Sequence, residues 1–268
     1  MSTSAPHRPL PSHALIGMVH LPPLPGSPAS EHSLSTIIAL ALADAQVLEQ
    51  AGFNALMIEN FGDAPFRATR VDPHTVACMT VVAQAIRAGT GLPIGINVLR
   101  NDPMAALAVA AACGAAFIRV NVHCGVYATD QGVIEGRADE TLRYRRLLGT
   151  STAIFADVHV KHARPLSTTS IAEAAEETAY RGRADALIVS GTATGKPTDL
   201  ADVGAVKTAV PDRPVYVGSG VTSATIHETL AVADGVIIGT AIKQNGRTTA
   251  PVDPARAAAF VQAAQAGG

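Results

Sequence analysis

The sequence predicts a single (β/α)8 barrel, an α/β fold, and three observations support this prediction. The chain has 268 residues, close to the ~250 residues typical of such a barrel. Short runs rich in β-branched residues alternate with longer Ala- and Leu-rich segments throughout the chain. Two glycine turns follow the last two expected strands, where barrels commonly bind phosphate. We expect a flexible N-terminal tail at residues 1–13 and a barrel domain at residues 14–268.

Eight short segments have the composition of buried strands. They are Ala14–His20, Ala55–Glu59, Pro93–Leu99, Ala116–His123, Ala153–Val160, Ala186–Ser190, Pro214–Gly218 and Gly235–Gly239. The helical segments that follow them are Leu34–Ala51, Thr75–Ala88, Pro103–Cys113, Glu140–Leu148, Ser170–Arg181, Asp199–Ala209, Ser223–Val232 and Pro254–Ala264. Eight strands, each followed by a helix, match the closed barrel. The alternative is an open doubly wound sheet, but Leu21–Pro28 lacks the glycine-rich dinucleotide turn expected after its first strand.

Local signals agree with these helices. Asp102 and Asp253 each precede a proline, which is the pattern of an N-cap followed by proline at the first helical position. Glycines stand where three helices should end, and a left-handed C-cap is expected there. These glycines are Gly52, Gly114 and Gly182. The segment Cys124–Asp139 contains no expected element, and it is either a binding loop or lid, or a surface excursion.

The composition predicts a cytoplasmic protein. Hydrophobic residues make up 48% and charged residues 16% of the chain, as in compact soluble domains. A net charge of −2 provides no basic field for nucleic acid or an anionic membrane. No apolar stretch reaches the ~20 residues of a spanning helix, and the first residues do not resemble a signal peptide. Three irregularly spaced cysteines fit a reducing compartment.

Polar and aliphatic residues alternate along the fourth and fifth expected strands, so each kind occupies one face. Both faces of a barrel strand are covered, and the aliphatic face should pack against the outer helices. The polar residues expected to point inward are Arg119, Asn121, His123, Asp157, His159 and Lys161. Glu59 and Asn97, late in the second and third strands, should join them. The C-terminal ends of the strands are where barrels place active sites.

Buried polar groups must pair with one another, with water or with a ligand. An internal salt bridge between Arg119 and Asp157 that only closes the barrel is one alternative. That alternative leaves four polar residues without a role, so the sequence favours an active site; they are Asn121, His123, His159 and Lys161.

The glycine turns are the second signal. Gly218, Ser219 and Gly220 follow the seventh strand, and Gly239 and Thr240 follow the eighth. Glycine allows backbone N–H groups to approach an anion, the Ser219 hydroxyl adds a donor, and the following helix adds its positive end. These turns predict a site for the phosphate group of a small molecule.

Several further residues are candidates for the same pocket. Segment 191–196 resembles a phosphate-binding loop but has only three residues between its glycines, so it reads as an active-site loop. Its candidates are Thr194 and Lys196, and the other pocket candidates are His20, Asp130 and Ser190. Cys124 beside His123 is not expected to form a dyad, because adjacent strand residues point apart. No metal or other cofactor is predicted. The alternative is a divalent ion, although the first strand lacks the His-x-His pair common in metal-dependent hydrolase barrels; its candidate ligands are His20, Glu59, His123, Asp157 and His159.

Longer motifs resemble the BtpA/SgcQ family. They are Ile16–Pro28, Ala55–Phe66, Pro93–Asp102, Phe117–His123, Ala156–Ala163 and the two glycine turns, and the resemblance extends from Ala14 to Phe260. The turns are also similar to those of ribulose-phosphate-binding barrels. The resemblance implies a (β/α)8 fold, and it associates the family with photosystem I biogenesis and sugar uptake without implying a reaction.

These observations lead to three hypotheses. The first is an isomerase, epimerase or lyase that acts on a phosphorylated sugar-like metabolite. Its base would be Asp157 or Glu59, its acid His123 or His159, and Arg119, Asn97 or Lys161 would hold an enolate oxygen. Lys161 could instead form a Schiff base. The second hypothesis is a non-catalytic assembly or regulatory factor, and the third is a metal-dependent hydrolase. The barrel could also form a homo-oligomer.

Overall fold

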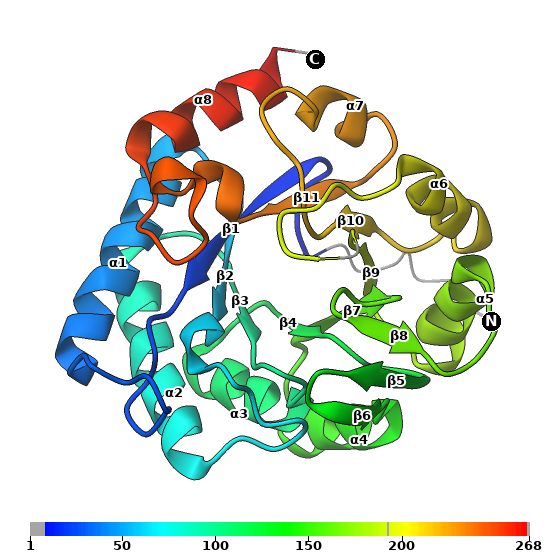
Figure 1. The fold of residues 1–268 in the computed structure, drawn as a ribbon, viewed down its shortest axis with the longest axis horizontal. Coiled ribbons are helices and arrows are strands. Elements are labelled where there is room, and N and C mark those ends of the chain that lie inside the picture. The colour runs from blue at the N-terminus through cyan, green and yellow to red at the C-terminus, as the bar shows by residue number, and fades with distance from the viewer. Residues whose placement is uncertain (1–8, 192, 267–268) are drawn as a thin grey trace.

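The computed structural model describes residues 9–191 and 193–266, and it contains a closed parallel barrel. Around the barrel the strands follow the order β1 (Ala14–His20), β11 (Gly235–Ile238), β10 (Val215–Val217), β9 (Ala186–Val189), β7 (Ala153–Val158), β4 (Phe117–Val120), β3 (Ile94–Asn97) and β2 (Ala55–Glu59). Figure 1 views the molecule down the barrel, with the helices arranged in a ring around the strands. The predicted (β/α)8 fold is therefore confirmed.

The ring contains α1 (Leu34–Ala51), α2 (Pro73–Gly89), α3 (Pro103–Cys113), α4 (Ala138–Leu147), α5 (Ile171–Glu176), α6 (Leu200–Ala209), α7 (Ile226–Leu230) and α8 (Pro254–Gln265). Short turns η1 (Phe61–Asp63), η3 (Thr240–Ile242) and η4 (Gln244–Gly246) lie between elements, and the π-helical turn η2 (Glu177–Arg181) continues α5. The sequence predicts a helix over Ser223–Val232, but in the structure α7 contains only five of these residues.

Most of the predicted helix ends are present. The Asp102 side chain accepts a hydrogen bond from the Ala105 N–H, and Asp253 caps α8 in the same way. Gly52 and Gly114 adopt left-handed conformations, with φ of 95° and 69°. The prediction for Gly182 is wrong, because its φ is −73° and the left-handed residue is Arg183. A Cβ at residue 182 would lie 2.5 Å from Cys124 Sγ, so this glycine permits close packing instead.

Helix α1 is long and apolar enough, by length and composition alone, to cross a membrane. In the barrel its residues Ile37, Ala41, Ala45 and Leu48 are buried against neighbouring elements. The core helix of a soluble protein can have the same length and hydropathy as a membrane-spanning helix, so these two properties are weak evidence for a span. The sequence predicts a flexible tail at residues 1–13, and residues 1–8 of it lie outside the described residues. Leu10, in the described part, is buried among the residues that fill the barrel.

The barrel interior is divided into two layers. Toward the N-terminal ends of the strands the side chains are apolar, and the rings of Phe117, Phe155 and Tyr216 stack with centroid separations of 4.5 and 5.0 Å. Gly95 is needed beside them, because a Cβ there would overlap the Phe117 ring. Toward the C-terminal ends the inward positions carry polar groups or glycine. This layering places the polar groups at the C-terminal mouth, where a cavity opens.

The segment Cys124–Asp139 is not the loop that the sequence suggested. It forms the hairpin β5 (Val126–Thr129) and β6 (Gly132–Glu135), and β8 (Ala163–Pro165) adds to it in the order β6-β5-β8. Tyr127 and Ile134 form a small buried cluster under this sheet with Val122 and Val160. The hairpin turns at residues 130–131, and β6 begins at Gly132, whose φ is +98°. Figure 1 shows the small sheet beside the ends of β4 and β7.

Candidate active site

A buried ion pair crosses the barrel interior between β4 and β7. Arg119 donates two hydrogen bonds to the Asp157 carboxylate, from Nε at 2.8 Å and from Nη2 at 2.7 Å. Asn121 and Ser190 each donate a further hydrogen bond to Asp157, at 3.2 Å. Burial alone would lower the pKa of Arg119, but the Asp157 carboxylate raises it. The four hydrogen bonds engage both oxygens of Asp157, so this carboxylate positions Arg119 and does not offer a free lone pair to a substrate.

Asn97 extends this network to β3. Its Nδ2 donates to Asn121 Oδ1 at 3.0 Å and to the Arg119 carbonyl at 3.2 Å. Its Oδ1 is buried and has no partner among the described residues. The strand alternation therefore predicts correctly that Arg119, Asn121 and Asp157 point inward. Arg119 and Asp157 also form the salt bridge that the sequence left open as an alternative.

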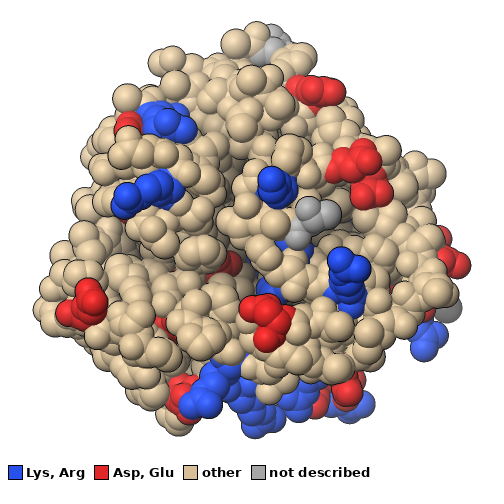
Figure 2. All heavy atoms as spheres, in the orientation of Figure 1, with Lys and Arg blue, Asp and Glu red and all other residues tan. Residues whose placement is uncertain are grey.

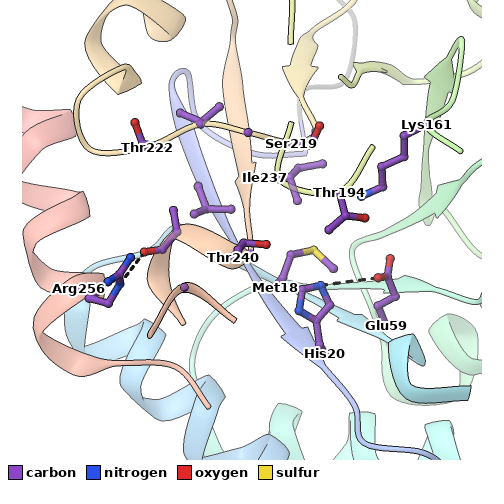
Figure 3. A pocket seen from close by; sticks show the side chains of 18 of the residues that line it. Met18, His20, Glu59, Lys161, Thr194, Ser219, Thr222, Ile237, Thr240 and Arg256 are labelled. Carbon is purple, nitrogen blue, oxygen red and sulfur yellow. Dashed lines mark hydrogen bonds and ion pairs between the residues drawn. The ribbon is translucent and has the colours of Figure 1, made fainter. Parts of the chain in front are cut away.

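A cavity of about 160 Å³ opens beside this network at the barrel mouth. Its walls combine both glycine turns with side chains from the first, second and fourth barrel strands and from the segments that follow the fifth and sixth. Among the lining residues are His20, Glu59, Arg119, Lys161, Thr194, Gly218, Ser219, Gly220, Gly239 and Thr240. Figure 2 shows the hollow at the centre of this face. Figure 3 shows His20, Glu59 and Lys161 directed into the same space. The structure therefore brings the expected phosphate turns and several expected catalytic residues into one pocket.

His20 and Glu59 form a close pair on adjacent strands. His20 Nε2 lies 3.7 Å from Glu59 Oε1, and the two side chains are 6% and 7% exposed. Burial raises the pKa of Glu59, although the cations Lys161, Arg119 and Arg100 oppose the shift. Burial, with the charges of Lys243 and Lys161, holds the pKa of His20 well below its usual value. Both shifts favour the uncharged forms, which suits a pair that exchanges a proton with a bound ligand.

Lys161 follows β7 and reaches into the pocket (Figure 3). Burial and, to a smaller extent, the charge of Arg119 lower its pKa from 10.5 to about 8, while Glu59 and Asp157 oppose the shift. Its ammonium group has no hydrogen bond or ion pair with any of the residues 9–191 and 193–266. Only its backbone carbonyl is engaged, by the Arg100 guanidinium at 2.6 Å.

The glycines of the two turns are sterically required. A Cβ at Gly218 would lie 2.5 Å from Ser190 Oγ, and one at Gly239 would lie 2.9 Å from His20 Cε1. Gly220 has φ +75°, and a Cβ there would overlap the Lys196 carbonyl. The N–H groups of Ser219 and Gly220 are not bonded to any described acceptor. Thr240 begins η3, so the first N–H groups of that turn also lack intrahelical partners.

Two parts of the predicted phosphate site differ in the structure. The Ser219 hydroxyl accepts a hydrogen bond from the Gly191 N–H at 3.0 Å and donates one to the Lys196 carbonyl at 3.4 Å, so its O–H holds the loop after β9 and is not free for a ligand. The helix after this turn, α7, begins only at Ile226, and its end does not adjoin Gly220. The backbone N–H groups of the turns therefore remain as the anion donors.

His123 is not brought into the pocket. Its side chain is fully buried, and Nε2 donates to the Gly182 carbonyl at 2.8 Å. Burial lowers its pKa. The physical reason is that β4 ends at Val120, so strand alternation no longer defines the direction of residue 123.

A second cavity, of about 780 Å³, lies between the barrel mouth and the small sheet. The predicted residues Asp130, His159 and Ser190 line it, and so does Lys161. His159 has φ 53°, which turns the chain away from β7. Thr194 lines the first cavity, and its N–H donates to His162 Nε2 at 3.1 Å. Lys196 contacts Gly220 through its backbone carbonyl, and its side chain is exposed.

Sequence reasoning missed three residues at this mouth. Arg256, in the first turn of α8, lines the first cavity and donates from Nε to the Ala241 carbonyl at 3.0 Å (Figure 3). Thr222 lines the same cavity beyond the first glycine turn. Arg100 is buried beside Lys161. Arg100 follows β3, so the rule that active sites lie at the C-terminal ends of strands could have found it.

Within the described ranges, no group of three or more His, Cys, Asp or Glu side chains is arranged to hold a metal ion. The chain matches the family model described as BtpA family over residues 11–266. It belongs to the BtpA family. It is 46% identical over 249 residues to the photosystem I biogenesis protein BtpA of Synechocystis sp., covering 93% of this chain and 87% of the relative. The sgc region protein SgcQ of Escherichia coli is 34% identical, and the match covers 93% of each chain.

Solved structures share the fold at low sequence identity. N-(5'-phosphoribosyl)anthranilate isomerase from Pyrococcus furiosus superposes with a TM-score of 0.58 at 13% identity, over 95% of this chain and 99% of that one. GGGPS from Thermoplasma volcanium gives a TM-score of 0.60 at 15% identity, over 96% and 94% of the two chains. These likenesses support the barrel, whereas the site must be argued from its own residues.

Proposed function

We propose that this protein is an enzyme acting on a phosphorylated sugar or sugar-like metabolite in the cytoplasm, as an isomerase, epimerase or lyase. The observation that carries the proposal is that two glycine turns, a buried carboxyl–imidazole pair and an unpaired lysine share one cavity. Each feature alone has a structural explanation. Their convergence at the C-terminal mouth of a barrel fits catalysis on a ligand held by its phosphate.

In this proposal the turns bind the phosphate, and the carbon skeleton lies over Glu59 and Lys161. The N–H groups of Ser219 and Gly220, which have no acceptor among the described residues, would bind the anion, and Arg256 would supply a positive charge at the same wall. The neighbours named phosphoribosylanthranilate isomerase and thiamine phosphate pyrophosphorylase are barrels whose names include phosphorylated compounds, which supports the choice of ligand by analogy.

Glu59 is the better candidate for the proton-transferring base. The alternative, Asp157, already accepts four hydrogen bonds. Glu59 has only the looser contact to His20, and burial raises its pKa toward the working range of a general base. His20 would receive or return the proton, and Arg119 and Lys161 would stabilise charge that develops on a carbonyl oxygen.

A thermal-shift screen tests the phosphate site. Inorganic phosphate, pentose and hexose phosphates, and nucleotides are compared with the same compounds lacking phosphate. A ligand present at 100 times its Kd should stabilise the fold by about 2.7 kcal/mol and raise the Tm. Equal shifts with phosphorylated and unphosphorylated partners would remove the proposal.

One relative supports a second proposal, a non-catalytic role in assembly. The protein from Synechocystis is named for photosystem I biogenesis. If this chain acts only as a binding or assembly factor, a Glu59→Gln and Lys161→Met double variant should retain its biological function. We also propose that the protein forms a homo-oligomer under either function. Light scattering measures the oligomeric state directly.

A further inference from the structure

Lys161 stands where the two cavities meet. It lines the 160 Å³ cavity at the glycine turns, and it also lines the 780 Å³ cavity under the small sheet. An engineered cavity of about 150 Å³ holds a benzene molecule, which has six heavy atoms. A phosphate group alone has five. The first cavity therefore has room for the phosphate end of a ligand, and the remainder of a longer molecule can extend past Lys161 toward the second cavity.

The environment of this lysine differs from that of other lysines in the protein. Lys243 is more deeply buried, at 1% exposed, but it pairs with Asp44 at 2.6 Å. Lys207 pairs with Asp234 at 2.8 Å. Lys161 has no such partner within the described part of the chain, although Glu59 and Asp157 are close enough to influence it. Lys161 is half-buried. An unpaired cation that is shielded from water is costly, and losing its proton relieves that cost.

The same environment makes Lys161 reactive. With a pKa of about 8, roughly one tenth of the amine is neutral at pH 7. A neutral amine in a partly dry pocket is a nucleophile toward carbonyl carbon. Glu59 lines the same pocket and can carry protons for such a reaction (Figure 3).

We propose that Lys161 forms an imine with the carbonyl carbon of a phosphorylated β-hydroxy ketone or aldehyde, and that the protein cleaves the adjacent carbon–carbon bond. This inference rests on the phosphate site proposed above and narrows its chemistry to a lyase. The two halves of the substrate then occupy the two cavities, with the breaking bond beside Lys161.

The steps balance without an added oxidant or reductant. The Nζ lone pair attacks the carbonyl carbon, and the oxygen leaves as water with protons relayed by Glu59. The Glu59 carboxylate takes the proton of the β-hydroxyl group. The electron pair of the bond between the α and β carbons moves into the iminium, so an aldehyde departs and an enamine remains. Glu59 returns a proton to the enamine carbon, and water hydrolyses the imine to restore the amine.

Reductive trapping tests this inference. The full-length protein is incubated with dihydroxyacetone phosphate, glyceraldehyde 3-phosphate or glycolaldehyde phosphate, then treated with sodium borohydride and examined by intact mass and peptide mapping. Glycerol 3-phosphate, which has no carbonyl group, is the ligand control. Lys161→Arg removes the nucleophile and keeps the charge, and Lys196→Arg is the matched control at an exposed lysine of the same mouth.

We expect one reduced adduct per chain on Lys161 with at least one carbonyl phosphate. The adduct should be lost in Lys161→Arg and retained in Lys196→Arg. If carbonyl phosphates raise the Tm but label no residue, or label other lysines equally, the imine is excluded while the phosphate site stands. If no phosphate compound, glycerol 3-phosphate included, shifts the Tm, the phosphate site itself fails and the inference fails with it.

Discussion

Replacing Lys161 by methionine should stabilise the protein while removing its chemistry. Methionine has a similar length and needs no counter-ion. In the wild type, folding moves a charged amine into a pocket where it has no hydrogen-bonding partner among the described residues. Apolar replacements of buried charges are often neutral or stabilising, and active sites commonly sacrifice stability for function.

The magnitude follows from the proton affinity of Lys161. Its pKa falls from 10.5 to about 8 in the folded protein, and each tenfold change in proton affinity corresponds to about 1.4 kcal/mol. Below pH 8 the folded state therefore bears a cost of about 3 kcal/mol. Between pH 8 and 10.5 the unfolded chain holds more protons than the folded one, so wild-type stability rises with pH across that window. The advantage of Lys161→Met should shrink over the same window.

Urea denaturation of both proteins at pH 7 and pH 9.5 measures this difference. At pH 7 the variant should gain up to about 3 kcal/mol, or roughly 6 °C or more in Tm for a chain of this size. Lys196→Met, at an exposed lysine, should change stability by less than ~0.5 kcal/mol. A Lys161→Met protein less stable than wild type at pH 7, or one with a gain independent of pH, would refute the reasoning.

Three further predictions concern the same mouth. Gly220→Ala should lower the free energy of unfolding, measured by urea denaturation, by clearly more than ~1 kcal/mol, because it adds a clash with Lys196 to the strain of a positive φ. Gly114→Ala is the control: it has the same strain but open space around the new Cβ, so it should cost about 1 kcal/mol. Equal losses in the two variants would contradict this prediction. Asp157→Asn should lower the free energy of unfolding by about 3–5 kcal/mol, because it leaves the buried Arg119 charge without its counter-ion. The double variant Arg119→Met/Asp157→Leu should regain part of that stability. An unchanged urea midpoint in Asp157→Asn would contradict this prediction. Glu59→Gln should slow turnover about 100-fold or more while ligand-induced Tm shifts persist; unchanged turnover would exclude Glu59 as the base.

Much of the fold follows from local patterns in the sequence. Short aliphatic runs identify the barrel strands, and the Asp-Pro caps identify the starts of α3 and α8. The hairpin β5–β6 was missed because its alternation, with Tyr127 and Ile134 inward, is short and surrounded by glycines. Gly182 was misread because its small size serves packing against Cys124 rather than a left-handed turn.

The site shows where alternation stops being informative. Arg119 and Asp157 lie within their strands, and their inward direction follows from side-chain periodicity. His123 and His159 lie beyond the strand ends, where the backbone turns and periodicity is lost. Arg256 could not be found in this way, because its place in the pocket depends on how α8 packs on η3.

The central claim is that the glycine turns bind a phosphate group, and calorimetric titration of glycerol 3-phosphate tests it most directly. Thr222 is the best position for a perturbation, since it lines the pocket, is exposed, and can be changed without disturbing the Ser219 hydrogen bond to the β9 loop. Thr222→Asp adds a negative charge beside the site. Thr222→Asn is the matched control, because asparagine has the shape of aspartate but no charge. We predict binding by the wild type and Thr222→Asn and none by Thr222→Asp. Equal binding by all three proteins, or equal binding of glycerol, would contradict a phosphate site at these turns.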